Sequence, residues 1–237
     1  MEMLAASSPL RTHATRTQGV VRSFSIEGPS GRLEAVLNEG AANAPFAALV
    51  CHPHPLGGGT LHNKVVYHAM KVLSAPSWGF GFPVLRFNFR GVGLSRGVHD
   101  GELEREDVRA ALEWLENEYN RPQIVLGFSF GAAMALAACC SASRDLRRVR
   151  ALVALGLPTQ AEGRIYDYHS LSHCTIPKLF LSGDHDAYAP ADQLACVVAS
   201  AAAPKHLRLL PNSDHFFAGQ LASMQQALAD WLTQGLR

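Results

Sequence analysis

The pentapeptide at residues 127–131, G-F-S-F-G, constrains the fold of this chain more than any other part of its sequence. An apolar run at residues 124–126 precedes it, and an alanine-rich stretch of helical character follows it. A turn that joins a strand to a helix this sharply holds its central residue in a strained backbone conformation, and glycines two positions to either side relieve the crowding. The pattern therefore predicts an elbow between a buried strand and a helix, with Ser129 as a candidate nucleophile.

The rest of the chain fits a sheet around that elbow. Apolar runs and amphipathic stretches alternate from about Val20 to the C-terminus, which is typical of a mainly parallel sheet with helices on both faces. Residues 20–27 and 32–37 flank a Gly-Pro-Ser-Gly turn and predict an antiparallel hairpin. The expected buried strands are residues 47–51, 83–88, 124–126, 151–155, 178–181 and 206–210, and the expected helices are residues 62–74, 102–118, 132–142, 191–202 and 217–236. The fold class is thus α/β, with eight strands.

Length and composition favour one catalytic domain. A chain of 237 residues with 48% hydrophobic and 17% charged residues can bury one large core. We expect residues 20–237 to form this domain, and residues 1–19, rich in Ser, Thr and Arg, to be a disordered leader rather than an organelle transit peptide. The interval at residues 158–177 is too short for a folded helical lid, so the site is expected to be open or only lightly covered.

Charge and cysteine usage limit the partners. The 21 basic and 20 acidic residues nearly cancel, and no basic cluster alternates with aromatic residues, which argues against nucleic-acid binding. No run of about eighteen apolar residues occurs, so no membrane span is expected. Five cysteines lack C-x-x-C spacing, and we interpret them as reduced core thiols, which suits a cytoplasmic protein: Cys51, Cys139, Cys140, Cys174 and Cys196. A secreted protein with one disulfide is the alternative that the cysteine count alone leaves open.

Partners for the serine follow two later strands. A serine hydroxyl is a poor nucleophile unless a histidine accepts its proton and a carboxylate orients that histidine. Asp184 and Asp186 come after one expected buried strand, and His215 comes after the next. Because the carboxyl ends of parallel strands meet at one edge of a sheet, Ser129, one of these aspartates and His215 are expected to converge there. Their order along the chain is serine, acid, histidine.

That order resembles the α/β-hydrolase superfamily. A closer similarity, to the small lidless bacterial hydrolases of the dienelactone-hydrolase-like branch, appears in two segments. They are C-H-P-H-P-L-G-G-G-T at residues 51–60, followed by N-K-V-V, and R-F-N-F-R-G-V-G-L-S at residues 86–95. The resemblance implies that the acid is Asp186 rather than Asp184. The chain departs from the branch at Leu61, where methionine is common, and this bears on substrate preference.

An acyl-transfer site also needs two N–H groups that hold the oxyanion. The elbow provides the backbone N–H of Phe130, the residue after the nucleophile. The second donor is expected in the loop after the third strand, where Pro53 and Pro55 have no N–H and leave His54 and Leu56 as candidates. The resemblance favours His54.

Other polar and aromatic residues lie near these segments in the sequence. His52, His54 and His62 are close in sequence, but no carboxylate or cysteine completes a ligand set, so we expect no metal and no cofactor. Three phenylalanines are candidates for an apolar substrate pocket, although each equally fits the core: Phe128, Phe216 and Phe217. Three acids are expected to form a solvated helix start: Glu104, Glu106 and Asp107.

The resemblance and the residue set together imply a serine hydrolase that cleaves small carboxylic esters, carboxylesterase-like, through an acyl-enzyme on Ser129. Hydrolysis of thioesters, lactones or peptides uses the same residues and is the first alternative. A noncatalytic ligand-binding protein of the same fold is the second.

Overall fold

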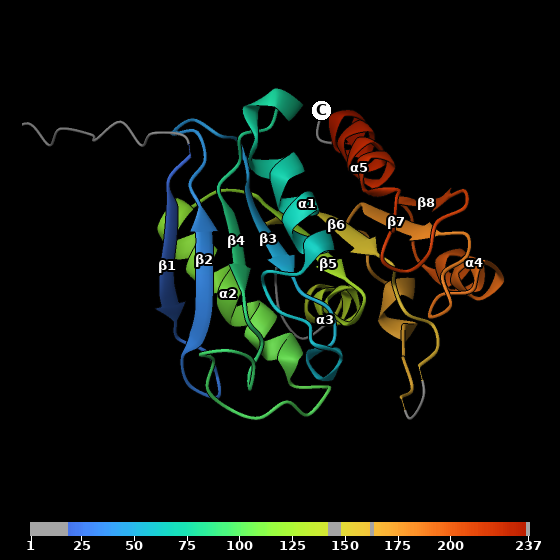
Figure 1. The fold of residues 1–237 in the computed structure, drawn as a ribbon, viewed down its shortest axis with the longest axis horizontal. Helices are drawn as coiled ribbons and strands as arrows, with labels where there is room; N and C mark the ends of the chain where they lie inside the picture. Colours follow the sequence, from blue (N-terminus) through green and yellow to red (C-terminus); the bar gives the residue numbers. More distant parts are fainter. Residues whose placement is uncertain (1–18, 142–147, 162–163, 236–237) are drawn as a thin grey trace, which may run out of the picture.

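A twisted eight-stranded sheet forms the centre of the computed structural model, which describes residues 19–141, 148–161 and 164–235 (Figure 1). The strand order is β1-β2-β4-β3-β5-β6-β7-β8. The expected leader, residues 1–19, lies outside the described residues except for Gly19. The strands are β1 (Val21–Ile26), β2 (Leu33–Asn38), β3 (Ala47–Cys51), β4 (Val84–Phe87), β5 (Gln123–Phe128), β6 (Val149–Leu155), β7 (Lys178–Gly183) and β8 (Lys205–Leu210).

The strand directions agree with the sequence pattern. β1 and β2 form the expected antiparallel hairpin, and β2 also runs antiparallel to β4. From β4 through β3, β5, β6 and β7 to β8, every neighbouring pair is parallel. All residues of β3 and β5 are buried, because these central strands have helices on both faces. The prediction of an eight-stranded, mostly parallel α/β fold is confirmed.

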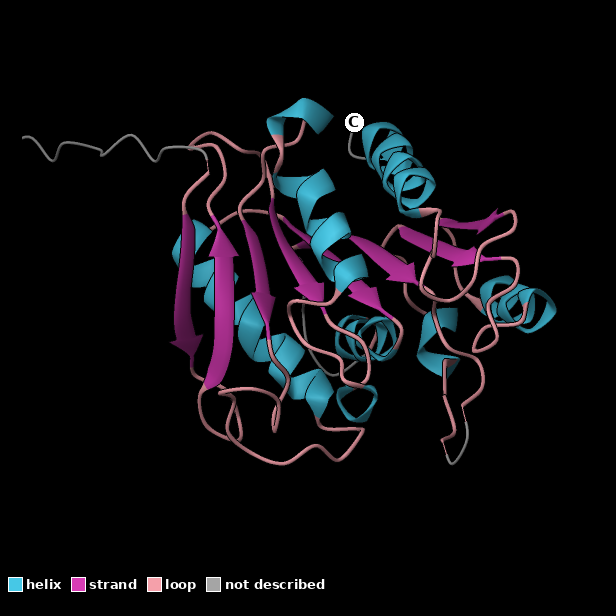
Figure 2. Ribbon diagram, viewed as in Figure 1, coloured by secondary structure: helices cyan, strands magenta, loops and turns pink. Residues whose placement is uncertain are grey.

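Two layers of helices cover the sheet (Figure 2). α1 (Lys64–Ser74) and α5 (Leu221–Gly235) pack together on one face. α2 (Glu104–Tyr119) and α3 (Phe130–Cys139) pack on the other, where α4 (Ala191–Ser200) contributes Leu194 to the same core. The five predicted helices are therefore present, with ends that differ by a few residues.

The cysteines differ from the sequence-based expectation. Cys140, just after α3, forms a disulfide with Cys174, in the segment before β7. Cys51 and Cys139 are buried free thiols, as expected, but Cys196 is exposed. The prediction that all five are reduced core thiols is thus wrong, because the fold brings two sulfurs together across 34 residues of sequence. A disulfide is more typical of oxidising compartments, so cysteine usage no longer favours the cytoplasm.

Within the described ranges, no helix combines the length and the apolarity that crossing a membrane requires.

Candidate active site

The elbow between β5 and α3 has the geometry that the pentapeptide predicts. Ser129 has φ 54° and ψ −122°, a conformation that is strained for a residue with a side chain. A Cβ atom at Gly127 would lie 2.2 Å from the carbonyl oxygen of Gly131, and one at Gly131 would lie 2.4 Å from the carbonyl oxygen of His52. Only glycine fits at these two positions, so the backbone closes tightly and leaves the serine side chain at the turn.

Ser129 is the end of a continuous hydrogen-bonded chain of side chains. Nε2 of His215 is 2.9 Å from Oγ of Ser129. Nδ1 of the same ring is 2.9 and 2.8 Å from the two carboxylate oxygens of Asp186. The three residues follow β5, β8 and β7, so the parallel strands bring them to one edge of the sheet as expected.

Asp186 is held as an ionised carboxylate. It is 3% exposed, and its oxygens accept hydrogen bonds from the Ser182 hydroxyl and from the backbone N–H groups of Tyr188 and Ala189. Burial by itself raises the pKa of Asp186. The hydrogen bond and charge of His215, together with the bonds from Ser182 and Tyr188, outweigh burial and lower this pKa below its ordinary value. The carboxylate can therefore orient His215 and stabilise its protonated form.

The competing aspartate lies elsewhere. Asp184 accepts the backbone N–H of Ser213 and pairs with the exposed ring of His185. The structure thus brings Asp186, and not Asp184, to His215, in agreement with what the resemblance implies. Ser182 was not found from the sequence, since its hydroxyl is recognisable only once the loop after β7 folds back on the strand.

The hydrogen bonds of the loop after β3 distinguish His54 from Leu56, the two candidates for the second oxyanion donor. The backbone N–H of Leu56 donates to Nδ1 of the His54 ring at 3.1 Å and is therefore occupied. Across the described parts of the chain, the backbone N–H groups of His54 and Phe130 make no hydrogen bond. These two N–H groups therefore have no competing acceptor among the described residues, and both stay candidates for the oxyanion donors. The Leu56 side chain is 82% exposed.

His52 is a structural anchor of that loop. Its Nδ1 lies 2.7 Å from the carbonyl oxygen of Pro53, and its Nε2 accepts the backbone N–H of Phe89 at 3.0 Å. Burial lowers the pKa of His52 to about 4, despite the hydrogen bond to Pro53, so the ring is neutral at neutral pH. Both ring nitrogens are thus bonded within the protein, which leaves neither for a metal. Among the described residues, no group of three His, Cys, Asp or Glu side chains could hold a metal ion.

The aromatic candidates occupy different environments. Phe128 and Phe217 are completely buried, and both belong to the core between the sheet and α1 and α5. Phe216 is 54% exposed and is the only one of the three that can contact a ligand in solution. The ring centroid of Phe216 is 5.2 Å from that of His215. The ring centroid of Tyr188, a residue not found from the sequence, is 4.6 Å from that of His215. Tyr188 and Phe216 therefore flank the imidazole.

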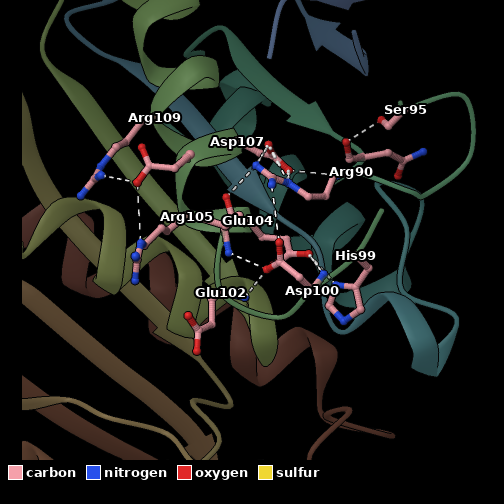
Figure 3. A network of polar contacts seen from close by, with 12 residues as sticks. Arg90, Ser95, His99, Asp100, Glu102, Glu104, Arg105, Asp107 and Arg109 are labelled. Atoms are coloured by element: carbon pink, nitrogen blue, oxygen red, sulfur yellow. Dashed lines mark hydrogen bonds and ion pairs between the residues drawn. The ribbon is translucent and has the colours of Figure 1, made fainter. Parts of the chain in front are cut away.

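The start of α2 is not the solvated surface that its sequence predicts (Figure 3). Glu104 and Asp107 are completely buried. Asp107 accepts the guanidinium and backbone N–H groups of Arg90, at 2.7 Å for the shortest contact. Burial raises the pKa of Asp107 in spite of these bonds. The prediction of a solvated helix start is wrong, because the segment after β4 turns back over α2 and brings Arg90 to Asp107 and His99 to Glu104. Glu106 is half-buried and pairs with Arg109.

The sheet order and the serine elbow define the class of α/β-hydrolase-fold proteins, and the comparisons agree. Residues 49–168 match the family model of the alpha/beta hydrolase fold. An uncharacterised protein of Rickettsia prowazekii is 37% identical over an alignment of 218 residues, and the match covers 87% of this chain and 87% of that protein. The chain belongs to the alpha/beta hydrolase fold family, and hydrolysis is the reaction class that this membership supports.

Two solved structures are similar over nearly the whole chain. An alpha-beta serine hydrolase homologue from Coxiella burnetii is 33% identical with a TM-score of 0.78, covering 89% of this chain and 97% of that one. A serine hydrolase without a lid from Xanthomonas campestris is 29% identical with a TM-score of 0.78, covering 90% and 94%. The prediction of an α/β-hydrolase fold without a substantial lid domain is thereby confirmed.

Proposed function

We propose that this protein is a serine hydrolase that cleaves small carboxylic esters through an acyl-enzyme on Ser129. The observation that supports this most directly is the unbroken chain of hydrogen bonds from Asp186 through His215 to Ser129. Each contact is 2.8–2.9 Å long, within the reach that proton transfer requires. No metal or cofactor is needed for this chemistry.

In the proposed mechanism, Oγ of Ser129 attacks the ester carbonyl while Nε2 of His215 takes its proton. Asp186 holds the imidazole in the tautomer whose Nδ1–H faces the carboxylate, and stabilises the imidazolium that forms. The same imidazolium then protonates the leaving alcohol. A water molecule, activated by His215, attacks the acyl-enzyme and releases the carboxylic acid.

The oxyanion of each tetrahedral intermediate is assigned to the backbone N–H groups of His54 and Phe130. Both lack an intramolecular acceptor in the described structure, and Phe130 lies at the first turn of α3, where the helix dipole favours negative charge. Leu56 is assigned no donor role, because its N–H is bonded to His54. Phe216 and Tyr188 provide the exposed apolar surface beside His215, which suits a small ester better than a nucleic acid or another polyanion.

Thioester, lactone and peptide hydrolysis share the acyl-enzyme and remain alternatives within the same mechanism. A ligand-binding protein that makes no covalent intermediate is the alternative of another kind. The two kinds differ in one property: only a hydrolase has a Ser129 that reacts covalently with a fluorophosphonate.

The proposal is tested with p-nitrophenyl acetate and with a fluorophosphonate probe. Ser129→Ala is expected to lower kcat/KM by about three orders of magnitude or more and to abolish labelling, with unchanged thermal unfolding. Asp186→Asn is expected to lower kcat strongly, because it favours the wrong imidazole tautomer, whereas Asp184→Asn serves as the matched control with near wild-type turnover. Undiminished hydrolysis by Ser129→Ala, or wild-type protein that the probe does not label, would refute the proposal.

A further inference from the structure

His99 and Glu104 form a second histidine–carboxylate pair (Figure 3). The ring of His99 packs against that of His54, in the loop after β3. Nδ1 of His99 is 2.6 Å from Oε1 of Glu104, and the Glu104 side chain is completely buried. The carboxylate also accepts the backbone N–H groups of Asp100 and Gly101, each at 3.0 Å. Glu104 therefore fixes the orientation of the His99 ring from the first turn of α2.

The His99 ring contacts both residues to which the oxyanion donors are assigned. Its centroid is 4.8 Å from that of His54 and 5.5 Å from that of Phe130, with edge-to-face geometry in both cases. The rings of His54 and Phe130 are themselves 4.9 Å apart. The three rings thus form one cluster, and that cluster is tied to α2 through Glu104.

Packing alone does not explain a histidine at position 99. Its Nε2 atom is buried and, among the described residues, has no hydrogen-bond partner. A buried nitrogen without a partner costs free energy, and phenylalanine would fill the same space without that cost. The Nδ1 bond to Glu104 is what a histidine provides here and phenylalanine does not.

His54 links this cluster to the backbone of the loop. Its ring accepts the N–H of Leu56, and its carbonyl oxygen accepts the N–H groups of Gly57 and Gly59 at 3.1 and 3.0 Å. Burial, followed by the electrostatic influence of Arg164 and His99, lowers the pKa of His54 to about 4. The ring therefore remains neutral, and Nδ1 stays an acceptor. Rotation of the His54 side chain would break the bond from Leu56, which helps to hold the loop backbone that carries the His54 N–H.

We propose that His99 is a positioning residue for the loop after β3. Held by Glu104, the His99 ring fixes the ring of His54 and thereby orients the His54 backbone N–H toward the oxyanion. The inference rests on the proposed ester hydrolysis at Ser129. An oxyanion donor acts on the transition state far more than on the bound substrate. Loss of His99 is therefore expected to lower kcat and to leave KM nearly unchanged.

Two variants separate the ring from its bond to Glu104. His99→Asn keeps an amide N–H for the carboxylate and removes the ring, whereas His99→Phe keeps a ring and removes the donor. His185→Asn is the matched control, because Nδ1 of His185 lies 3.0 Å from Oδ1 of Asp184 in a histidine–carboxylate pair whose histidine side chain is 68% exposed.

The readouts are kcat and KM for p-nitrophenyl acetate, and the inhibition constant of an aliphatic trifluoromethyl ketone, whose adduct with a serine places an oxyanion in the site. Both His99 variants are expected to lower kcat by about tenfold to 100-fold, less than the loss of a whole donor, and to weaken the ketone by the same factor. KM should change by no more than about twofold, and His185→Asn should match the wild type.

Wild-type kcat in His99→Asn would overturn the inference, as would a loss of kcat without weaker ketone binding or a rise in KM alone. Should His99→Phe fail to fold because Glu104 loses its donor, His99→Asn decides the question. The failure of the proposed function itself has a different signature, namely hydrolysis that persists in Ser129→Ala. Hydrolysis that requires Ser129 but not His99 removes only the inference about the loop.

Discussion

The buried ring of His52 is expected to make the folded state sensitive to mild acid. Its pKa is lowered from 6.5 to about 4 by burial, because protonation would place a charge in the core and break the acceptor bond from the Phe89 N–H. The unfolded chain binds this proton near pH 6.5 and the folded protein does not. Stability from the neutral ring is therefore complete above pH 6.5 and declines as the pH falls toward 4.

The size of the effect follows from the two pKa values. The difference between a pKa of 6.5 and one of about 4 corresponds to about 3 kcal/mol once both the unfolded and the folded states are protonated, and about 2 kcal/mol of it is lost between pH 7 and pH 5. The assay is urea unfolding at these two pH values for the wild type and for His52→Gln, which has an amide donor and acceptor but no proton that titrates in this range.

We expect the free energy of unfolding of the wild type to fall about 2 kcal/mol further than that of His52→Gln over this interval, although the variant is less stable at pH 7. All other titrating groups are common to both proteins and cancel in the comparison. Equal pH dependence in the two proteins would show that His52 is not held neutral, and the argument from its burial would fail.

Two further predictions concern a glycine beside the site and the disulfide. A Cβ atom at Gly156, where φ is +52°, would lie 3.2 Å from Cε1 and Nδ1 of His215. Gly156→Ala should therefore displace the His215 ring and lower kcat about tenfold or more. Gly79→Ala is the control for backbone strain alone, because φ is +85° there and a Cβ atom would have no other atom within 4 Å. Equal kcat in the two variants would show that displacement of the His215 ring is not the cause of the loss. Reducing the Cys140–Cys174 disulfide, which closes 34 residues, should lower the free energy of unfolding by about 4 kcal/mol in urea titrations, and Cys174→Ser should lose its response to reductant. An unchanged unfolding midpoint after reduction argues against that bond.

Much of the fold and of the candidate site followed from local patterns in the sequence. Continuous apolar runs marked the central strands, because a strand covered on both faces has no polar side to display. The elbow was recognisable because Gly127 and Gly131 are required by contacts of 2.2 and 2.4 Å that any side chain would violate. Ser129 and His215 were placed together because parallel strands end at one edge of the sheet.

What the sequence could not supply depends on contacts between distant segments. Acids at the start of a helix are usually solvated, and nothing local indicates that Arg90 would bury Asp107 or that His99 would bury Glu104. The partners of Leu56 depend on the rotamer of His54, which only the folded loop determines. The disulfide forms because the end of α3 lies beside the segment before β7, and the spacing of the cysteines in the sequence does not indicate that contact.

The place of β6 in the sheet has a consequence for how the site is spaced. β6 lies between β5, which ends at the serine, and β7, which leads to the acid. Two strand spacings amount to about 10 Å, too far for a serine and a carboxylate to touch but close to the span of one imidazole with a hydrogen bond at each end. The intervening strand thus sets the gap that His215 fills, and Gly156, the residue after β6, has no side chain to occupy it. The spacing of the strands therefore sets the distance between Ser129 and Asp186, and the residue that follows the middle strand has to be a glycine.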